Sequence, residues 1–387
     1  MKKFLALLLL LAMLISVFAG CGEKDNPETP SNSGNIASST GTEKDEYTIG
    51  VVIWSTDDAT TGPIKSILDY LGGELGFNFR YKTGDFDAES QLSAVENFVD
   101  AGVDGIMIVP LVDASIGNLY QVCEDAKIPY VQFFRGVEDE ELAADMLSRD
   151  YFLGWTSEDD VAAGYHMVEI LAEQGADNVA CIYMGPGNQA TDDRQTGMEK
   201  AFEAGVANKV TDYILPMGSA DATLWTQATQ NFINQYGDGI DAIISSVGSN
   251  GGSEAVLAAI ESSGVDYIAG EFDPPSTAEY AFEKGYLGVT ATGMMCDPVY
   301  AFVIMANYLM GTPLSEDPIC LDTGYIYITS AEDQASYTQY VDADGVYAYH
   351  AEEISNMLRR NNPDFTAEDL QQAAMDWSLQ DVINRHR

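Results

Sequence analysis

Basic residues are scarce in this sequence. Of its 387 residues, 18 are Lys or Arg and 61 are Asp or Glu, which gives a formal net charge of −43 at pH 7. A surface with this excess of negative charge repels the phosphates of nucleic acids and the headgroups of anionic lipids. The composition therefore excludes a nucleic-acid-binding protein, and we expect no nucleic acid among the partners.

Histidine is rarer still, and motifs of catalysis are absent. The three histidines, His166, His350 and His386, are scattered along the chain without the spacing of a metal or catalytic site. No serine nucleophile elbow occurs, and no Gly-x-Gly-x-x-Gly loop opens a helix. We predict that the chain is not an enzyme and that it carries no cofactor and no metal ion.

Cysteine is the third scarce residue. After Cys21 the sequence has four cysteines, and their spacing matches no metal site. Each lies in an apolar segment, where a free cysteine behaves as a small hydrophobic residue. We therefore expect unpaired core thiols, with disulfide pairing as the alternative, at Cys123, Cys181, Cys296 and Cys320.

The apolar run over residues 5–18 is too short to span a bilayer. It follows two lysines, an order typical of an export signal. The run ends in Phe18-Ala19-Gly20-Cys21, which resembles a bacterial lipobox, whose cysteine is acylated and becomes the first residue of the mature chain. We predict a signal peptide over 1–20 and lipidation of Cys21, with ordinary secretion as the alternative.

Residues 21–46 contain almost no apolar side chain. Gly, Glu, Lys, Asp, Asn, Pro, Ser and Thr dominate this stretch, a composition that cannot form a core. We predict a disordered tether over 21–46 that joins the lipid anchor to the folded part. The expected location is extracytoplasmic, on the cell membrane.

The remaining residues, 47–387, exceed the usual size of a single core, so two lobes are expected. From Tyr47 onward, short runs rich in Val and Ile alternate with segments of helical periodicity, which is typical of βα units in a parallel sheet. This alternation pauses after a strand over 129–134 and begins again with a helix over 161–174. The pattern predicts an α/β fold of two Rossmann-like lobes with parallel sheets.

Residues 347–387 form a separate helical C-terminal extension in this interpretation. Apolar spacing predicts one amphipathic helix around 354–358 and another over 366–383. Thr366 stands before acidic residues and is a suitable N-cap. We expect the extension to pack on a lobe, and partner binding is the alternative.

Several short motifs occur in a characteristic order. They are the strand 48–53, the stretch Ala101-Gly102-Val103-Asp104-Gly105 leading into the strand that ends at Pro110, the strand start Ile128-Pro129, the pair Arg194 and Gly197, and the strand end Phe272-Asp273. In this order and spacing, the chain over about 47–330 resembles the ribose-binding protein family of class I periplasmic solute-binding proteins.

The resemblance implies a periplasmic-binding-protein-like I fold. Lobe 1 is expected over 47–154 and 294–321, and lobe 2 over 155–293 and 322–346, with a three-strand hinge between them. Ligands of open α/β sheets bind beyond the carboxyl ends of the strands. The implied function is an extracytoplasmic substrate-binding lipoprotein of an ABC transporter that closes on a small polar solute, a sugar or sugar derivative.

Three charged residues are the leading candidates for the binding site. Arg135 follows an apolar strand, where an unpaired guanidinium is costly unless it meets a ligand or a carboxylate. Arg194 lies near the start of a helix, where a cation opposes the helix dipole. Asp273 ends a strand. The resemblance implies that all three contact the ligand, while a structural salt bridge for Arg135 and a helix cap for Asp273 are the alternatives.

A second group of candidates follows other strands of the predicted sheets. Trp54, Asp57 and Asp58 end the first strand, where the family has a polar and aromatic loop. Ser249 and Asn250 precede a helix at a position where the family has a polar ligand residue. For Trp54, Asp57 and Asp58 the alternative is a solvated turn, and for Ser249 and Asn250 the sequence leaves open which of the two matches the family position.

The sequence also departs from the ribose-binding pattern. Phe134 stands where ribose-type proteins have Asp, and Val109 stands where they have Asn. A Gln of the family is replaced by Gly293 or Met294. These departures argue against ribose itself. They are compatible with a larger or less hydroxylated ligand, or with another sugar derivative, to which Trp54, Phe133 and Phe134 would supply apolar contact.

The resemblance also implies the partners. We expect a monomer that delivers its sugar-like solute to the permease of an ABC transporter and that reaches the membrane through its N-terminal lipid anchor. The alternative function is a ligand-sensing receptor that presents the bound solute to a membrane sensor kinase or chemoreceptor.

Overall fold

The computed structural model describes residue 44 and residues 46–55, 61–84, 87–111, 113–137, 139–219, 221–248, 251–343 and 345–387. The predicted signal peptide, Cys21 and almost all of the predicted tether lie outside these residues. So do the site candidates Asp57, Asp58, Ser249 and Asn250.

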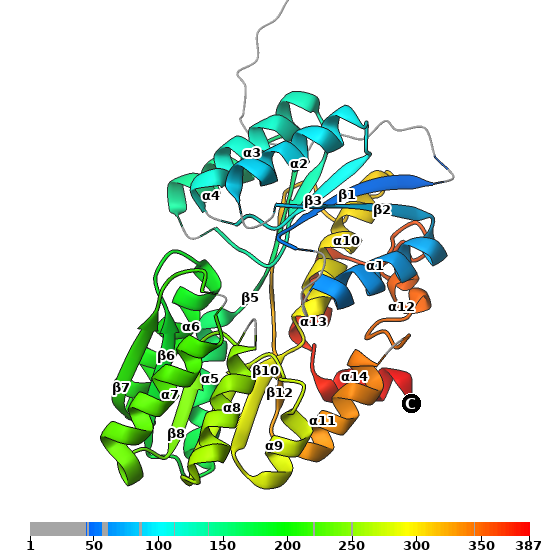
Figure 1. Ribbon diagram of the computed structural model, residues 1–387. Helices are drawn as coiled ribbons and strands as arrows, with labels where there is room; N and C mark the ends of the chain where they lie inside the picture. Colours follow the sequence, from blue (N-terminus) through cyan, green and yellow to red (C-terminus); the bar gives the residue numbers. More distant parts are fainter. Residues whose placement is uncertain are drawn as a thin grey trace, which may run out of the picture. The chain divides into compact units, whose positions relative to one another are not determined.

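The first of two sheets has six strands in the order β11-β5-β4-β3-β1-β2, and all of its pairings are parallel. We call this sheet with its flanking helices lobe 1 (Figure 1). Alternate residues of a strand point to opposite faces, and here both faces are buried. The strands are β1 (Tyr47–Ile53), β2 (Phe77–Thr83), β3 (Gly105–Ile108), β4 (Tyr130–Gln132), β5 (Phe152–Glu158) and β11 (Ile319–Thr323).

Helices cover both faces of this first sheet. Residues Ile49 and Val51 of β1 share a core with α1 and α10, whereas Val52 shares a core with α2 and α3. The helix α10 is apolar nearly all round and is buried along almost its whole length. The helices of lobe 1 are α1 (Thr61–Leu75), α2 (Ala88–Asp100), α3 (Asp113–Ala126), α4 (Glu140–Leu147) and α10 (Asp297–Leu309).

The second sheet also has six strands, in the order β12-β10-β9-β8-β6-β7, and forms lobe 2 with its helices. Only β12 pairs antiparallel, with β10. The strands are β6 (Asn178–Met184), β7 (Asn208–Leu215), β8 (Ala242–Ser245), β9 (Ile268–Phe272), β10 (Leu287–Thr292) and β12 (Ile326–Ile328). The helices are α5 (Asp160–Glu173), α6 (Gln189–Glu203), α7 (Thr223–Tyr236), α8 (Gly252–Ser263), α9 (Ala278–Lys284) and α11 (Ala331–Tyr337).

Three segments of the described chain connect the two sheets. The chain crosses from β5 to α5, from β10 to α10, and from β11 to β12. The predicted fold of two α/β lobes joined by a three-strand hinge is confirmed. Helices α4 and α9 and strand β5 have weaker sequence patterns, and we did not expect them from periodicity.

The C-terminal extension has three helices where two were predicted. They are α12 (Ala351–Asn356), α13 (Ala367–Met375) and α14 (Leu379–His386). Thr366 caps α13 as expected, but the predicted helix 366–383 is wrong because Ser378 has an extended backbone and its side chain accepts from the N–H of Asp381, which starts a new helix. The extension packs on both lobes, since α12 contacts α1 and α13 contacts β11 of lobe 1, whereas α14 contacts α11 of lobe 2.

All four cysteines after Cys21 are unpaired, as predicted. Cys123, Cys181 and Cys296 are buried, but Cys320 is exposed, so its prediction as a core thiol is wrong. It lies on β11, an edge strand of the first sheet, and faces away from the core. Among the described residues, no helix has both the length and the apolar character needed to cross a membrane.

Candidate functional site

The turn that follows β4 holds Phe134 and Arg135 in a fixed backbone conformation. Phe134 has a φ of +62°, which is rare for a residue with a side chain. Its N–H donates to Asp297 Oδ1 (2.9 Å), while Gln132 Nε2 donates to the carbonyls of Arg135 (2.6 Å) and Gly136 (3.0 Å). The strained turn is therefore stabilised by buried polar groups, and such strain often occurs at binding sites.

Two predicted aromatic residues meet at the carboxyl ends of β1 and β4. The ring centroids of Trp54 and Phe134 lie 5.8 Å apart, and Phe134 also contacts Phe133 at 5.3 Å. Phe134 is buried and Trp54 is half-buried. Arg135 is half-buried beside them, and its positive charge acts on the buried carboxyl of Asp297. These two elements bring three of the predicted residues to one edge of lobe 1.

Arg194 is buried in lobe 2 and has four polar contacts. Its Nε donates to Asp160 Oδ1 (2.7 Å), Nη1 to the carbonyl of Ser246 (3.2 Å), and Nη2 to the Tyr325 hydroxyl (2.8 Å) and, more weakly, to the Met294 sulfur (3.7 Å). Its guanidinium carbon also lies 4.1 Å from the ring centroid of Phe272. Burial alone opposes the charge, but Asp160 and Tyr325 overcome it and raise the pKa of Arg194.

Gly197 explains why Arg194 lies so close to Asp160. A Cβ on Gly197 would be 1.9 Å from the Val161 carbonyl oxygen, and a Cβ on Gly164 would be 2.0 Å from the Arg194 carbonyl oxygen. Helices α5 and α6 therefore pack backbone against backbone at these two glycines. The Arg-x-x-Gly motif noted in the sequence is thus a packing device that positions the guanidinium.

Asp273 follows β9 in a left-handed backbone conformation. Its φ is +64°, and its N–H donates to the Ala291 carbonyl (2.8 Å) of β10. It lies close enough to Arg194 for its charge to favour the guanidinium. The alternative of a helix cap is not supported, because the N-cap of the following helix α9 is Thr277. Arg194 and Asp273 thus lie near each other in lobe 2.

Two buried carboxyl groups at the hinge were missed by the sequence analysis. Asp297 starts α10, and its Oδ1 accepts from the Phe134 N–H and the Thr156 hydroxyl. Glu158 ends β5. Among the described residues, neither Asp297 Oδ2 nor Glu158 Oε1 has a hydrogen-bond partner. Burial raises the pKa of Asp297 to about 7 and, together with the charge of Asp297, raises the pKa of Glu158 well above its usual range.

A cavity of about 290 Å³ opens beside Glu158. Phe134 and Gly136 of lobe 1 and Gln189 and Asp193 of lobe 2 contribute to its wall. Of the predicted site residues that the structure describes, Phe134 alone lines it, while Arg194 adjoins it through its ion pair with Asp160. Its acidic lining residues are Glu158, Asp159, Asp160, Asp193 and Asp322.

The geometry and the fold agree with a known family. A family model described as a periplasmic binding protein domain matches residues 49–311. This chain belongs to that family. Its members are binding proteins, so the family prediction made from the sequence is confirmed.

Two characterised relatives of this periplasmic binding protein have names that state their ligands. A xylitol-binding protein of Mycolicibacterium smegmatis is 24% identical over 238 residues, which cover 59% of this chain and 62% of the relative. A ribose import binding protein of Bacillus subtilis is 24% identical over 294 residues, which cover 75% of this chain and 87% of the relative. The chain therefore spans less than two thirds of the first relative and most of the second.

Solved structures show the same fold at low sequence identity. An ABC transporter solute-binding protein from Bacillus halodurans with bound myo-inositol has a TM-score of 0.62 at 19% identity, over 77% of this chain and 99% of that one. A periplasmic solute-binding protein from Actinobacillus succinogenes with bound D-allose has a TM-score of 0.64 at 16% identity, over 76% and 100%. At such identities the likeness supports the fold of this periplasmic binding protein.

One sequence signal pointed to the missed residue Asp160. Residues 159 and 160 are consecutive aspartates after a strand, and one is enough to cap a helix. Asp159 performs the capping, since its side chain accepts from the Ala162 N–H (2.9 Å). The second carboxylate is free for another role, and the structure pairs it with Arg194. Trp225, near the start of α7, is a fully buried core residue.

Proposed function

We propose that this periplasmic binding protein is the extracytoplasmic substrate-binding component of an ABC transporter for a sugar or polyol. The observation that carries the proposal is the cavity whose wall comes from strand ends of lobe 1 and from the start of α6 in lobe 2. Three chain crossings beside this cavity supply a hinge on which the lobes close around a ligand. The binding chemistry needs no reacting group, so we propose no enzymatic activity.

The ligand we propose is neutral and rich in hydroxyl groups. Xylitol, ribose, myo-inositol and D-allose, named for the relatives, all have this chemistry. Hydroxyl groups donate to carboxylates, and the acidic residues of the cavity wall supply such acceptors. The apolar C–H face of a sugar or cyclitol matches the Trp54–Phe134 aromatic pair.

The proposed contacts divide between the lobes. From lobe 1, Arg135 donates to ligand oxygens next to the aromatic pair. From lobe 2, Arg194 and Asp273 contribute, with the guanidinium held in place by Asp160. Asp57 and Asp58 after β1, and Ser249 and Asn250 before α8, stay predicted ligand contacts. A charged hydrogen bond contributes roughly 1.5–3 kcal/mol, so three or four of them with one aromatic contact suffice for micromolar binding, about −8 kcal/mol.

The proposal includes a membrane anchor and a permease. Lipidation of Cys21 after removal of residues 1–20 would hold the protein at the cell membrane, and the stretch 21–46 would act as the tether. The relatives include an import binding protein and an ABC transporter binding protein, which favours transport over sensing. The protein would meet its permease as a monomer.

A thermal-shift screen of pentoses, hexoses, pentitols and inositols tests the proposed function. A ligand at 100 times its dissociation constant adds about 2.7 kcal/mol of stability, which gives a clear rise in melting temperature. Binding of one of these classes, confirmed by calorimetry with a stoichiometry near one, supports the proposal. Failure of all four classes combined with binding of an amino acid or nucleoside would contradict the ligand class.

A further inference from the structure

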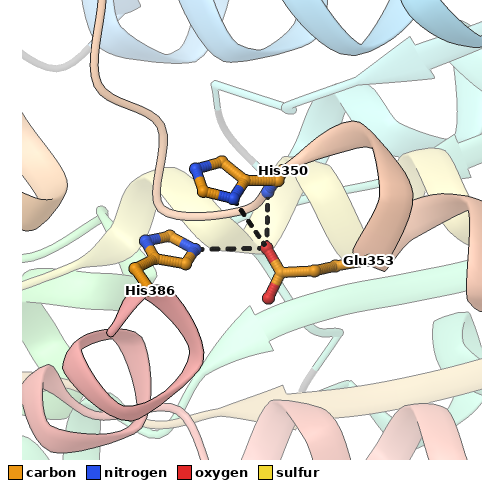
Figure 2. A group of neighbouring side chains, drawn as sticks. All are labelled: His350, Glu353 and His386. Atoms are coloured by element: carbon orange, nitrogen blue, oxygen red, sulfur yellow. Dashed lines mark hydrogen bonds and ion pairs between the residues drawn. The ribbon is translucent and has the colours of Figure 1, made fainter.

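We propose that His350, Glu353 and His386 form a binding site for a divalent transition-metal ion of the zinc class, which would join helices α12 and α14. The sequence has three histidines, and the fold brings two of them together around one carboxylate (Figure 2). Their potential ligand atoms all lie within 4.8 Å of one another. The site lies beyond residues 49–311 that match the family model.

The distances suit a small ion with two imidazoles and one carboxylate. Two ligands of a tetrahedral ion with bonds of about 2.0–2.1 Å lie about 3.3 Å apart. The distance between His386 Nε2 and Glu353 Oε2 is 3.2 Å, which matches the separation expected of two ligand atoms on one tetrahedral ion. His350 Nδ1 is 4.0 Å from the same oxygen, and the exposed His350 side chain has room to close that gap by a small rotation.

The two imidazole rings stack with centroids 4.0 Å apart and an interplanar angle of 13°. Stacking at this distance is unfavourable if both rings are charged, so it favours at least one neutral imidazole, the form that binds metal. Burial lowers the pKa of His386, helped by His350 and Arg385 and opposed by Glu353.

Neighbouring residues hold Glu353 in the orientation that a metal ligand needs. Arg385 Nη1 donates to Oε1 (2.6 Å), and the His350 backbone N–H donates to Oε2 (2.6 Å). Outer hydrogen bonds of this kind orient carboxylate ligands in metal sites. The positive charge of Arg385 is shared with Asp381, 2.9 Å from Nε, and with the Tyr349 ring, 4.2 Å from the guanidinium carbon. The second oxygen of Glu353 thus keeps capacity for a cation.

The simpler interpretation is a helix cap with surface ion pairs. That interpretation explains Glu353, which accepts from the first turn of its own helix, but it does not require two histidines from separate helices to stack there. Nitrogen ligands favour Zn²⁺, Ni²⁺ or Cu²⁺ over Ca²⁺ and Mg²⁺, which prefer oxygen. The site is therefore assigned to the transition metals.

The site lies between two helices that contact different parts of the fold, so a bound metal ion would connect these parts. Helix α12 contacts α1 of lobe 1, where the Ala351 N–H donates to the Tyr70 hydroxyl (3.1 Å). Helix α14 contacts α11, which in turn contacts α9 of lobe 2. A metal bound between α12 and α14 would link segments that pack on different lobes. Metal binding should then alter the stability of the whole chain.

Calorimetric titration of the chelator-treated full chain with ZnCl₂ at pH 7.5 tests the site. We expect one high-affinity event that is weakened at least about 10-fold at pH 5.5, where protons compete for the imidazoles. His350→Ala, a change at an exposed side chain, should weaken zinc binding by at least about 10-fold, and Glu353→Gln should weaken it similarly. His386→Ala, the third variant, should also weaken zinc binding. If His386→Ala does not fold, the zinc affinity of His350→Ala alone tests the site.

His166→Ala is the matched control, because His166 is exposed and pairs with one carboxylate, Glu169, without a second histidine. It should bind zinc like the wild-type chain. Equal zinc affinity in wild type and His350→Ala would overturn the proposal. So would weak binding of several ions that no variant changes, since this would reflect general attraction to the acidic surface. Calcium in place of zinc should give no comparable event.

Discussion

Asp160 and Arg194 form a buried ion pair between helices α5 and α6, with Oδ1 and Nε 2.7 Å apart. The Tyr325 hydroxyl joins them, because it donates to Asp160 Oδ1 (2.6 Å) and accepts from Arg194 Nη2 (2.8 Å). Tyr325 lies in the crossing between β11 and β12. The pair therefore connects two helices of lobe 2 to a hinge segment.

Asp160→Asn should destabilise the protein by about 3 kcal/mol, because it leaves a buried guanidinium without its counter-charge. Urea denaturation followed by circular dichroism measures this loss. Asp145→Asn is the control, since the Asp145 carboxylate is exposed to water in its pair with Arg149, and ion pairs that water screens contribute at most about 1 kcal/mol. Equal effects of the two substitutions would contradict a stabilising role for the buried pair.

Gly197→Ala should separate α6 from α5, since the new methyl group would overlap the Val161 carbonyl oxygen. We expect a loss of at least about 2 kcal/mol in the free energy of unfolding, together with weaker ligand binding because Arg194 moves with its helix. Gly73→Ala on α1 is the control, because nothing lies within 4 Å of its added Cβ. A Gly197→Ala protein of normal stability would show that the two helices are not in close contact.

Arg135→Ala should weaken binding of the sugar or polyol found in the screen and leave the fold unchanged. The loss of one charged hydrogen bond corresponds to roughly 1.5–3 kcal/mol, or about 10- to 150-fold in affinity. Calorimetry measures the affinity, and the melting temperature without ligand checks the fold. Arg80→Ala, at an exposed position on β2, should bind normally. Unchanged affinity in Arg135→Ala would remove Arg135 from the site.

Glu271 predicts a pH dependence of stability in lobe 2. Burial raises its pKa to about 8, against a stabilising hydrogen bond from Ser253 Oγ at 2.9 Å. The folded state therefore holds a proton that the unfolded state releases near pH 4.5. The contribution of protonated Glu271 to the free energy of unfolding is fully present below that pH. It is lost as pH rises toward 8, at up to about 1.4 kcal/mol per pH unit.

Glu271→Gln should reduce the loss of stability with rising pH to the part that Asp297 and Glu158 cause, and should leave the variant more stable than wild type at pH 8. Urea denaturation at several pH values between 5 and 8.5 measures the difference between the two proteins. Glu283→Gln, an exposed substitution on α9, should follow the wild-type curve. If wild type and Glu271→Gln lost stability in parallel, Glu271 would be ionised in the folded protein at neutral pH.

The sequence predicted the fold well because its signals are local. Alternating Val- and Ile-rich runs and helical periodicity placed most strands and helices of both lobes, and strand ends such as Arg135 and Asp273 follow directly from that order. The exposed Cys320 and the break before α14 were missed for a different reason. The position of Cys320 on an edge strand and the capping of α14 by Ser378 both depend on which neighbours a segment packs against, and the local sequence does not contain this information.

The sequence by itself determined the two-lobed α/β architecture, the acidic surface and the family, since periodicity, composition and short motifs carry them without knowledge of contacts. Only the tertiary structure decided which charges meet. Asp160 pairs with Arg194 because two glycines let α5 and α6 touch, and Asp297 becomes a buried acid because α10 returns from lobe 2 beneath the Phe134 turn. His350 and His386 come together because the fold places the start of α12 beside the end of α14, a juxtaposition that sequence spacing cannot reveal.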